Sequence, residues 1–563
     1  MKKKKWMSAL LTAVLVLGSA VGVPAATGTE PSAADTADVT VYGVEEGVTV
    51  TAYHLISAVY DEKGNGLTGY EVADGVEIED IESPTAEEIT EITRAINDGT
   101  LTISDREELE YQSDGTYTAS LTAGMWLILV SDAGDTVYNP MILSNWYSDA
   151  NDASSLQAGA VDAEGNFVEG EWSTDDDGND VYSGTAIYAK STTTTITKVI
   201  TDYENGNDYG TDGNVGDEVS FLITTQIPDY SDAYDDGTLQ FIITDTLSYG
   251  LSAIEPSDLT ITVGGTVFLA NGVDSSGAIY TNYTITTTPE KGSEKDEEDQ
   301  TIVISFSSDF ILEHIKETVT VAYTTTIDED ALMAEEGPNP NAVSLTYTNE
   351  YSTAQDGTLV PGTTTSGPKY VYVYTFALTD EFVKVSPGGS ASSSGTDVSV
   401  TKALSGASFT VCTDEDCTQV YTNDIFDGTA VSDENGCVSV EGLAEGTYYL
   451  TETEAPSGYY INDTVYKLVI YADYNSDGTI ANWNISITDD TGSATQIRSS
   501  DYTVSYTSDG SEVTAAVNAT AVVDSVRQKL PDTGDIGNLL FIVLSCSILG
   551  MAVLLMRMRK KPS

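Results

Sequence analysis

The 563-residue sequence contains few histidines and few basic residues. His54 and His314 are its only histidines, which argues against a histidine-based catalytic site or zinc centre. Only 23 lysines and arginines face 89 acidic residues, so the formal net charge is −66. A surface of this charge repels nucleic acid and favours solubility. We therefore expect no nucleic-acid partner, no metal centre and no cofactor.

Cysteine is also scarce. Cys546 lies in an apolar C-terminal segment, which leaves Cys412, Cys417 and Cys437 for the exported part of the chain. Three cysteines allow one disulfide and leave one thiol over. The sequence does not decide which two of them pair.

Short runs of Val, Ile, Tyr and Thr alternate with polar residues and are broken by Gly, Asp and Asn. This period of two is typical of half-buried β-strands. The chain is too long for one core. The sequence therefore predicts an all-β protein of tandem immunoglobulin-like β-sandwich domains, with boundaries at residues 32–189, 190–375 and 376–525.

The first domain is expected to contain one small helix. Ser83 suits its N-cap, Pro84 its first turn, and Gly99 its end. An apolar face at helical spacing would be formed by Ile89, Ile92 and Ile96.

Both ends of the chain carry targeting signals. Residues 1–26 have a lysine-rich start, a short apolar run and small residues at the end, which predicts a secretory signal peptide. Residues 539–556 are apolar over a length that spans a bilayer, and the basic residues of 557–563 keep this end cytoplasmic. The sequence therefore predicts a C-terminal transmembrane helix.

A five-residue segment N-terminal to this helix resembles the LPXTG sorting signal of Gram-positive surface proteins. It consists of Leu530, Pro531, Asp532, Thr533 and Gly534. The order of motif, apolar span and basic tail also matches that signal. The resemblance implies that a sortase cleaves between Thr533 and Gly534 and passes Thr533, as a thioester, to an amine. The mature protein would then be secreted and anchored to cell-wall peptidoglycan.

The second and third domains resemble the two isopeptide-forming domain types of Gram-positive backbone pilins. The more specific segments are Gly406–Phe409, of the form GAxF, and Glu452–Tyr459, which is similar to ETxAPxGY. Such domains form an amide between a lysine and an asparagine, assisted by an acid. The chemistry is reasonable, because burial disfavours the charged form of a lysine and so provides a neutral amine nucleophile.

The resemblance assigns these roles residue by residue. In the third domain it implies Lys384 as nucleophile, Glu452 as acid and Asn518 as acceptor, with Lys402 as the alternative nucleophile. In the second domain it implies Lys198 as nucleophile, Asp245 as acid and Asn341 as acceptor, with Asn349 as the alternative acceptor. The first domain has only Lys63, in a Gly/Asn turn, so no such bond is predicted there.

Backbone pilins also carry a lysine in a YPK-like motif between their first and second domains. Ala186–Lys190 resembles this motif, although Ala189 stands where proline is usual. The resemblance implies that Lys190 attacks the Thr533 thioester of the next subunit.

Three classes of function follow from these observations. The first is a structural subunit of a covalently polymerised pilus, whose partners would be sortase, peptidoglycan, other copies of itself and accessory pilins. The alternative is a monomeric wall-anchored adhesin that binds a host ligand. A secreted enzyme would need a catalytic cluster, and the sequence has none beyond the self-processing groups.

One further segment resembles the front half of a calcium loop, from Asp473 through Asn475 and Asp477 to Gly478. The twelfth position is Asn484, so the bidentate acid of such a loop is missing. The sequence favours a tight hairpin turn at Asp477-Gly478.

Overall fold

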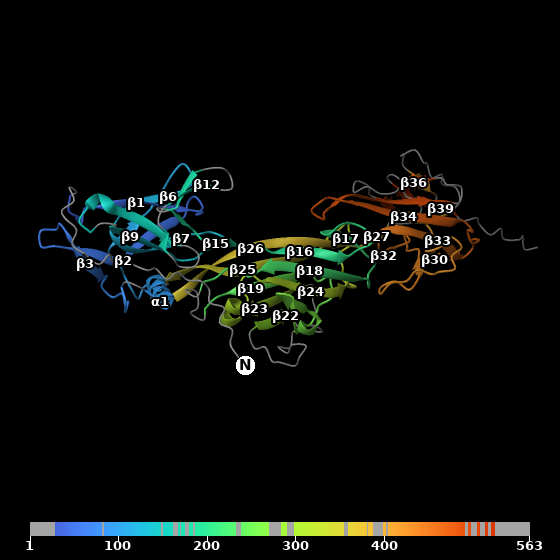
Figure 1. Cartoon of the computed structure of the whole chain (residues 1–563). Helices are drawn as coiled ribbons and strands as arrows, with labels where there is room; N and C mark the ends of the chain where they lie inside the picture. Colours follow the sequence, from blue (N-terminus) through green and yellow to red (C-terminus); the bar gives the residue numbers. More distant parts are fainter. Residues whose placement is uncertain are drawn as a thin grey trace, which may run out of the picture.

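The computed structural model describes residues 29–81, 84–147, 150–161, 167–168, 171–174, 180–183, 186–231, 238–269, 283–289, 298–353, 359–379, 381–386, 398–400, 403–489, 494–496, 504–506, 513–515 and 520–523. Strands dominate, and helices are few. The predicted all-β fold class is therefore confirmed. The described regions follow one another along an elongated molecule in chain order (Figure 1).

The first region consists of two main sheets. The four-stranded sheet has the order β14 (Ala186–Tyr188), β1 (Thr36–Tyr42), β6 (Tyr117–Thr122) and β5 (Glu110–Tyr111). The other sheet has the order β11 (Phe167–Val168), β10 (Leu156–Val161), β9 (Met141–Tyr147), β7 (Gly124–Ser131), β2 (Thr49–Tyr60) and β3 (Leu67–Val72), with β4 (Arg106–Glu108) also on β2. Val39, Trp126 and Leu143 are among the buried residues between them. Two further pairs join β12 (Glu171–Thr174) to β13 (Asp180–Ser183), and β8 (Thr136–Tyr138) to β15 (Ser191–Thr193).

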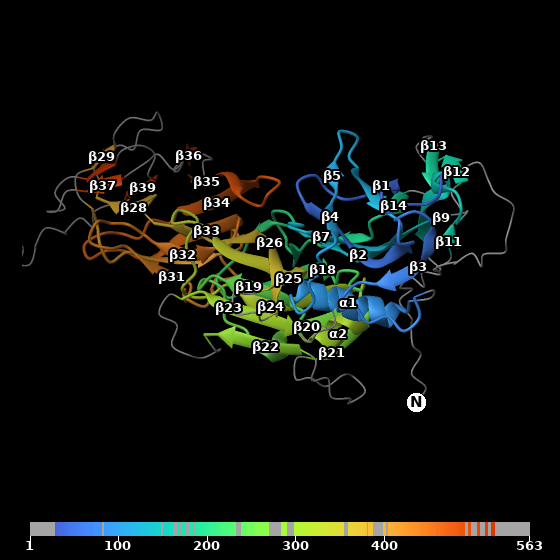
Figure 2. The ribbon, with the colours of Figure 1, turned by 90° about the vertical axis from the view of Figure 1, so that its left-hand side faces the viewer.

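The helix α1 spans Ala86–Asn97, and its N-cap is Thr85 rather than the predicted Ser83. Thr85 occupies the N-cap position because it stands three residues before Glu88 and forms a capping box with it. Glu88 N donates to Thr85 Oγ1 at 3.2 Å, and Thr85 N donates to the Glu88 carboxylate at 2.6 Å. Ile89 and Ile92 are buried as predicted. The helix lies beside β25 (Asn339–Thr353) of the next region (Figure 2).

The middle region is a sandwich of two sheets. One has the order β16 (Thr197–Asp202), β18 (Glu218–Gln226), β24 (Thr318–Thr326), β20 (Thr260–Val263) and β21 (Thr266–Leu269). The other has the order β17 (Gly210–Asp212), β26 (Leu359–Tyr374), β25 (Asn339–Thr353), β19 (Phe241–Leu247), β23 (Gln300–Phe306) and β22 (Tyr283–Thr288). Inward residues alternate with outward ones along β18, β19 and β24, as expected for two packed sheets. The short helix α2 (Ser308–Glu313) buries Phe310 and Ile311 in the same core.

The third region has a separate core. Its main sheet has the order β31 (Thr429–Val431), β30 (Ser408–Cys412), β33 (Gly446–Glu454), β34 (Val465–Tyr474), β35 (Ile480–Thr488) and β36 (Ala494–Gln496). Smaller sheets pair β27 (Phe376–Leu378) with β32 (Val440–Leu443), β28 (Phe382–Val385) with β39 (Thr520–Val523), and β38 (Val513–Ala515) with both β29 (Val398–Val400) and β37 (Val504–Tyr506). The pairing of β28 with β39 is parallel.

Polar side chains connect the regions. Asn139 of the first region donates from Nδ2 to the Asp229 carbonyl at 3.0 Å, and its Oδ1 accepts from Ser231 N at 3.0 Å. Between the middle and third regions, Asn214 Oδ1 accepts from the Tyr421 hydroxyl at 2.9 Å and from Ala444 N at 3.0 Å. These side-chain contacts connect the first region to the middle one and the middle region to the third.

The segment that resembles a calcium loop is a hairpin turn between β34 and β35. Asn475 N donates to the Thr479 carbonyl, and Gly478 has φ +85°. The turn also packs on the middle region, because a Cβ at Gly478 would stand 2.1 Å from the Tyr209 carbonyl oxygen. Glycine is therefore required here by both the turn and the close approach.

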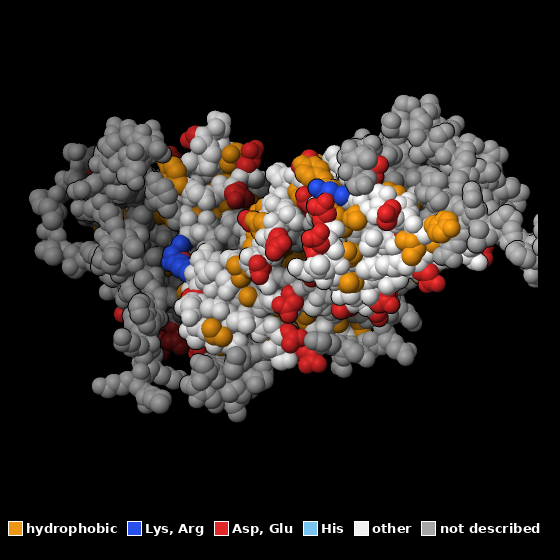
Figure 3. Space-filling model, turned by 90° about the vertical axis from the view of Figure 1, so that its right-hand side faces the viewer, with side chains coloured by type: hydrophobic (Ala, Val, Ile, Leu, Met, Phe, Trp, Pro, Cys, Tyr) orange, Lys and Arg blue, Asp and Glu red, His pale blue; other side chains and the backbone are white. Residues whose placement is uncertain are grey.

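On the face of the molecule drawn in Figure 3, acidic side chains are spread over the described residues, with few basic ones between them. Among the described residues, no helix is long and apolar enough to cross a membrane. The predicted signal peptide, sorting motif, transmembrane helix and tail lie outside the described residues.

Candidate functional site

The middle core contains a lysine with almost no solvent exposure. Lys198 takes an inward position on β16, in phase with the buried Ile200. Its Nζ donates to Asp245 Oδ1 and lies 2.5 Å from Asn341 Oδ1. Asp245 and Asn341 take inward positions on the paired strands β19 and β25. The structure therefore brings the predicted nucleophile, acid and first-choice acceptor together.

Tyr323 is a fourth member of this cluster, and the sequence reasoning missed it. Its hydroxyl donates to Asp245 Oδ2 at 2.5 Å and accepts from Asn341 Nδ2 at 2.7 Å and from Lys198 Nζ at 2.9 Å. The signal was present, because Tyr323 is in phase with the buried Val319 and Val321 on β24. A buried tyrosine on an inward position needs a partner for its hydroxyl.

Burial changes the proton affinities in this cluster. It lowers the pKa of Lys198 to about 8, although the Asp245 carboxylate opposes the shift. Burial also raises the pKa of Tyr323 well above its usual range, and the nearby Asp245 charge adds to this. A lowered lysine pKa makes the neutral amine more available, and a raised tyrosine pKa keeps the phenol protonated.

The alternative acceptor lies elsewhere. Asn349 is at the other end of β25, where its Nδ2 donates to the Gly134 carbonyl at 2.7 Å. The neighbouring Tyr347 hydroxyl donates to the Asp135 carbonyl. This end of β25 therefore contacts the first region and not Lys198.

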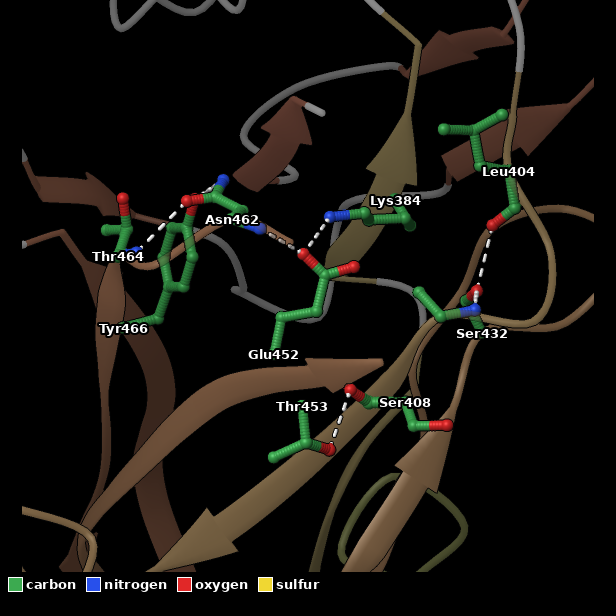
Figure 4. A network of polar contacts seen from close by, with 10 residues as sticks. Lys384, Leu404, Ser408, Ser432, Glu452, Thr453, Asn462, Thr464 and Tyr466 are labelled. Carbon is green, nitrogen blue, oxygen red and sulfur yellow. Dashed lines mark hydrogen bonds and ion pairs between the residues drawn. The ribbon is translucent and has the colours of Figure 1, made fainter. Parts of the chain in front are cut away.

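The third region contains a similar pair. Lys384 lies on β28 with its side chain fully buried, and its Nζ is 2.8 Å from Glu452 Oε2. The same oxygen accepts from Asn462 N at 2.7 Å. Figure 4 shows Glu452 between Lys384 and Asn462. The other carboxyl oxygen, Oε1, is buried and has no hydrogen-bond partner among the described residues.

The remaining predicted groups of this pair are outside the described residues. These are the acceptor Asn518 and the alternative nucleophile Lys402. The strand β39 begins at Thr520, and its parallel register pairs Lys384 with Val522. Thr520, which stands two residues after Asn518 in the sequence, pairs with Phe382 on the strand that carries Lys384.

Lys190 lies where the first and middle regions meet. Its side chain is 65% exposed, and its carbonyl accepts from Asn139 N at 2.9 Å. Its Nζ is 3.9 Å from Asp229 Oδ2, and Lys316 Nζ approaches the same oxygen at 2.5 Å. An exposed amine at this position is accessible to an enzyme and to a second subunit. In the first region, Lys63 lies in an exposed turn between β2 and β3.

The cysteine pairing left open by the sequence is resolved. Cys412 and Cys417 form a disulfide, and Cys437 is a buried cysteine outside this disulfide. Within the described residues, no group of three or more His, Cys, Asp or Glu side chains could hold a metal ion.

Comparisons with known proteins relate segments of the chain to known families. Residues 34–175 match the family described as T6 antigen Ig like domain, and residues 389–491 match the prealbumin-like fold domain family. The chain is 26% identical, over 446 residues, to the trypsin-resistant surface T6 protein of Streptococcus pyogenes serotype M6. That alignment covers 77% of this chain and 72% of the relative.

Comparison with solved structures gives one superposition that supports the fold and a weaker match. The T6 backbone pilin of serotype M6 Streptococcus pyogenes superposes with a TM-score of 0.55 at 21% identity, covering 88% of this chain and 94% of that one. The major pilin BcpA of Bacillus cereus also matches, at 14% identity and a TM-score of 0.38, with 87% of this chain and all of that one covered. The resemblance predicted from the sequence is therefore confirmed, and the chain is homologous to the T6 backbone pilin of Streptococcus pyogenes.

Proposed function

We propose that the chain is a structural subunit of a covalently polymerised, sortase-assembled pilus, stabilised by intramolecular Lys–Asn isopeptide bonds. Its homologues are structural pilin subunits on the cell surface. The observation that supports the proposed internal bonds is that two lysines are fully buried and that each contacts a buried carboxylate. Burying a lysine for structure alone is costly, whereas burial suits an amine that must attack while neutral.

In the middle region we propose that Lys198 attacks the Asn341 side chain and that Asp245 assists. Asn349 is not proposed as the acceptor, because its side chain contacts Gly134 instead. In the third region we propose Lys384, Glu452 and Asn518. The unpartnered Oε1 of Glu452 supports this assignment, because an acceptor amide brought beside Lys384 would provide its partner. Lys402 remains the alternative nucleophile.

The proposed domain boundaries are those predicted from the sequence, at 32–189, 190–375 and 376–525. Cleavage at Thr533 and transfer to Lys190 of the next subunit would join the copies. The last subunit would be transferred to peptidoglycan, and accessory pilins or a host ligand would bind the assembled shaft. We propose no enzymatic activity beyond the self-processing.

The experiment is an immunoblot of cell-wall extracts after denaturing electrophoresis. We expect a high-molecular-weight ladder from the wild type and a single monomer band from Lys190→Ala. Lys316→Ala is the matched control, because Lys316 is also exposed and approaches the same Asp229 oxygen. It should keep the ladder.

The other outcomes discriminate between the functions. If the ladder survives in Lys190→Ala but collapses in Lys316→Ala, Lys316 is the acceptor amine. A monomer band from the wild type would reject polymerisation and favour the monomeric wall-anchored adhesin.

A further inference from the structure

Tyr323 is the one described residue whose hydroxyl contacts all three groups of the middle cluster. It faces Phe221 across the β18–β24 pair, with ring centroids 5.4 Å apart, so its ring is fixed in the core. The ring position alone would serve packing. The hydroxyl, however, is directed at Lys198, Asp245 and Asn341 rather than at a backbone carbonyl.

The hydrogen bonds of the cluster connect its two nitrogens through Asp245 and Tyr323. Lys198 Nζ donates to Asp245 Oδ1, and Asp245 Oδ2 accepts from the Tyr323 hydroxyl. That hydroxyl in turn accepts from Asn341 Nδ2 at 2.7 Å. Because the phenol proton is committed to the carboxylate, the amide group that faces the phenol oxygen must be the NH₂ group. Both donor directions therefore lead to Asp245, one from the attacking nitrogen and one from the leaving nitrogen through Tyr323, so the phenol hydroxyl must turn once the carboxylate is protonated.

This arrangement addresses a chemical requirement of the bond proposed above. When Nζ attacks the Asn341 carbonyl carbon, the new C–N bond forms, and the amide nitrogen departs only if it gains a proton. Nζ must lose one proton in the same reaction. Within the described part of the chain, no histidine lies in this cluster, and the three groups are buried, so the proton needs a relay built from the cluster itself.

We propose that Tyr323 is the general acid of the middle-region cross-link and completes a proton relay from Lys198 to the leaving nitrogen of Asn341. In the neutral pair, Lys198 has already given one proton to Asp245, which carries it on Oδ2. As Nζ attacks, it passes a second proton to Asp245 Oδ1, Asp245 gives its Oδ2 proton to the Tyr323 oxygen, and the Tyr323 hydroxyl turns to give its own proton to Nδ2. The Cγ–Nδ2 bond breaks and ammonia leaves. Asp245 and Tyr323 end in their starting protonation states, so atoms and charges balance. This inference rests on the proposed isopeptide bond.

The electrostatics of the site are compatible with this role. The phenol stays protonated because burial and the Asp245 charge both oppose its ionisation. Lys198 reaches its neutral form more readily than an exposed lysine because it is buried. The relay therefore starts from an available amine and ends at a protonated acid.

The test compares the cross-linking rates of the full chain and a Tyr323→Phe variant. Each would be made by cell-free translation, quenched in denaturant at intervals, digested, and scored by mass spectrometry for the joined Lys198 and Asn341 peptides, which lose about 17 Da as ammonia. We expect Tyr323→Phe to slow the bond by about 100-fold or more, which is the usual range for loss of a general acid. Tyr347→Phe is the control, because Tyr347 is equally buried in this core but bonds to Asp135.

A second variant separates chemistry from folding. In a Lys198→Met background no bond forms, so adding Tyr323→Phe reports only the structural contribution of the hydroxyl to thermal unfolding. A small shift there, with a large loss of rate in the parent chain, supports the relay. A Tyr323→Phe chain that cross-links at the wild-type rate would overturn it. A wild-type chain that never joins these peptides would overturn the bond itself, and the relay with it.

Discussion

The two buried lysines of this protein occupy similar surroundings but have different partners. Lys198 Nζ lies 5.2 Å from the ring centroid of Phe221, and Lys384 Nζ lies 5.5 Å from the ring centroid of Phe409. Each contacts a carboxylate on an inward position of another strand. Asp245, however, has hydrogen bonds on both oxygens, whereas Glu452 has none on Oε1 among the described residues.

The strand topology differs as well. Lys198 and Asn341 lie on strands of opposite sheets, so a bond between them would join the two layers of the sandwich. Lys384 lies on β28, which pairs in parallel with β39 of the same small sheet. Asn518 stands two residues before β39 in the sequence, so we expect a bond to it to tie neighbouring strands. The comparison teaches that a buried lysine can contact a buried acid from two different strand arrangements.

The largest expected effect comes from removing the middle lysine. Lys198→Met prevents the cross-link and leaves Asp245 buried without its cation. By analogy with a disulfide that closes a loop of more than 100 residues, we expect a loss of about 4–5 kcal/mol, or roughly 10–20 °C in the unfolding temperature of this region. Differential scanning calorimetry of the exported chain measures this. An unchanged transition would show that Lys198 is not cross-linked.

Glu452→Gln should have a smaller effect in the third region. The amide keeps the size of the side chain but cannot act as the acid, so the ammonia lost on bond formation should be retained, a difference of about 17 Da. We expect a loss of about 3–4 kcal/mol, because the amide still accepts from Asn462 N while the cross-link is gone. Intact-mass spectrometry and calorimetry report both effects. A variant with the wild-type mass deficit would show that the acid is dispensable.

The two candidate asparagines provide the sharpest control on the middle site. Asn341→Ala should abolish the bond, whereas Asn349→Ala should keep it and cost about 1 kcal/mol through the lost hydrogen bond to Gly134. Peptide mapping of the Lys198 cross-link distinguishes them. The opposite pattern would make Asn349 the acceptor.

The smallest effect concerns the first region, which has no buried lysine among its described residues. Burial lowers the pKa of His54 below 6.5, although the hydrogen bond to Asp105 opposes the shift. Because the folded pKa lies below the unfolded one, stability should fall as the pH drops below about 6.5, by about 1 kcal/mol or less. His54→Gln should flatten this dependence between pH 7 and pH 5.5, as followed by thermal unfolding. A parallel slope in both proteins would rule out His54 as its source.

The sequence alone predicted much of the third and middle sites. Lys198 and Asp245 were identified by their motif positions, and the structure places both on inward phases of alternating strands. The helix was predicted, but its N-cap was wrong, because a cap depends on which of two nearby hydroxyl residues lies three positions before a suitable acid. Tyr323 was missed because 125 residues separate it from Lys198 and no local pattern links them.

What the sequence by itself determined is the β-rich class and the relationship to backbone pilins, whereas the signals at the two ends and the domain boundaries stay predictions. These conclusions depend on the local alternation of apolar and polar residues and on short motifs, and both are formed by residues that are close in sequence. Only the tertiary structure decided that Asn341 rather than Asn349 faces Lys198, that Cys412 pairs with Cys417, and that Tyr323 joins the cluster. The physical reason is that these contacts depend on strand register and on which sheet lies opposite, and both are set by the packing of the whole core.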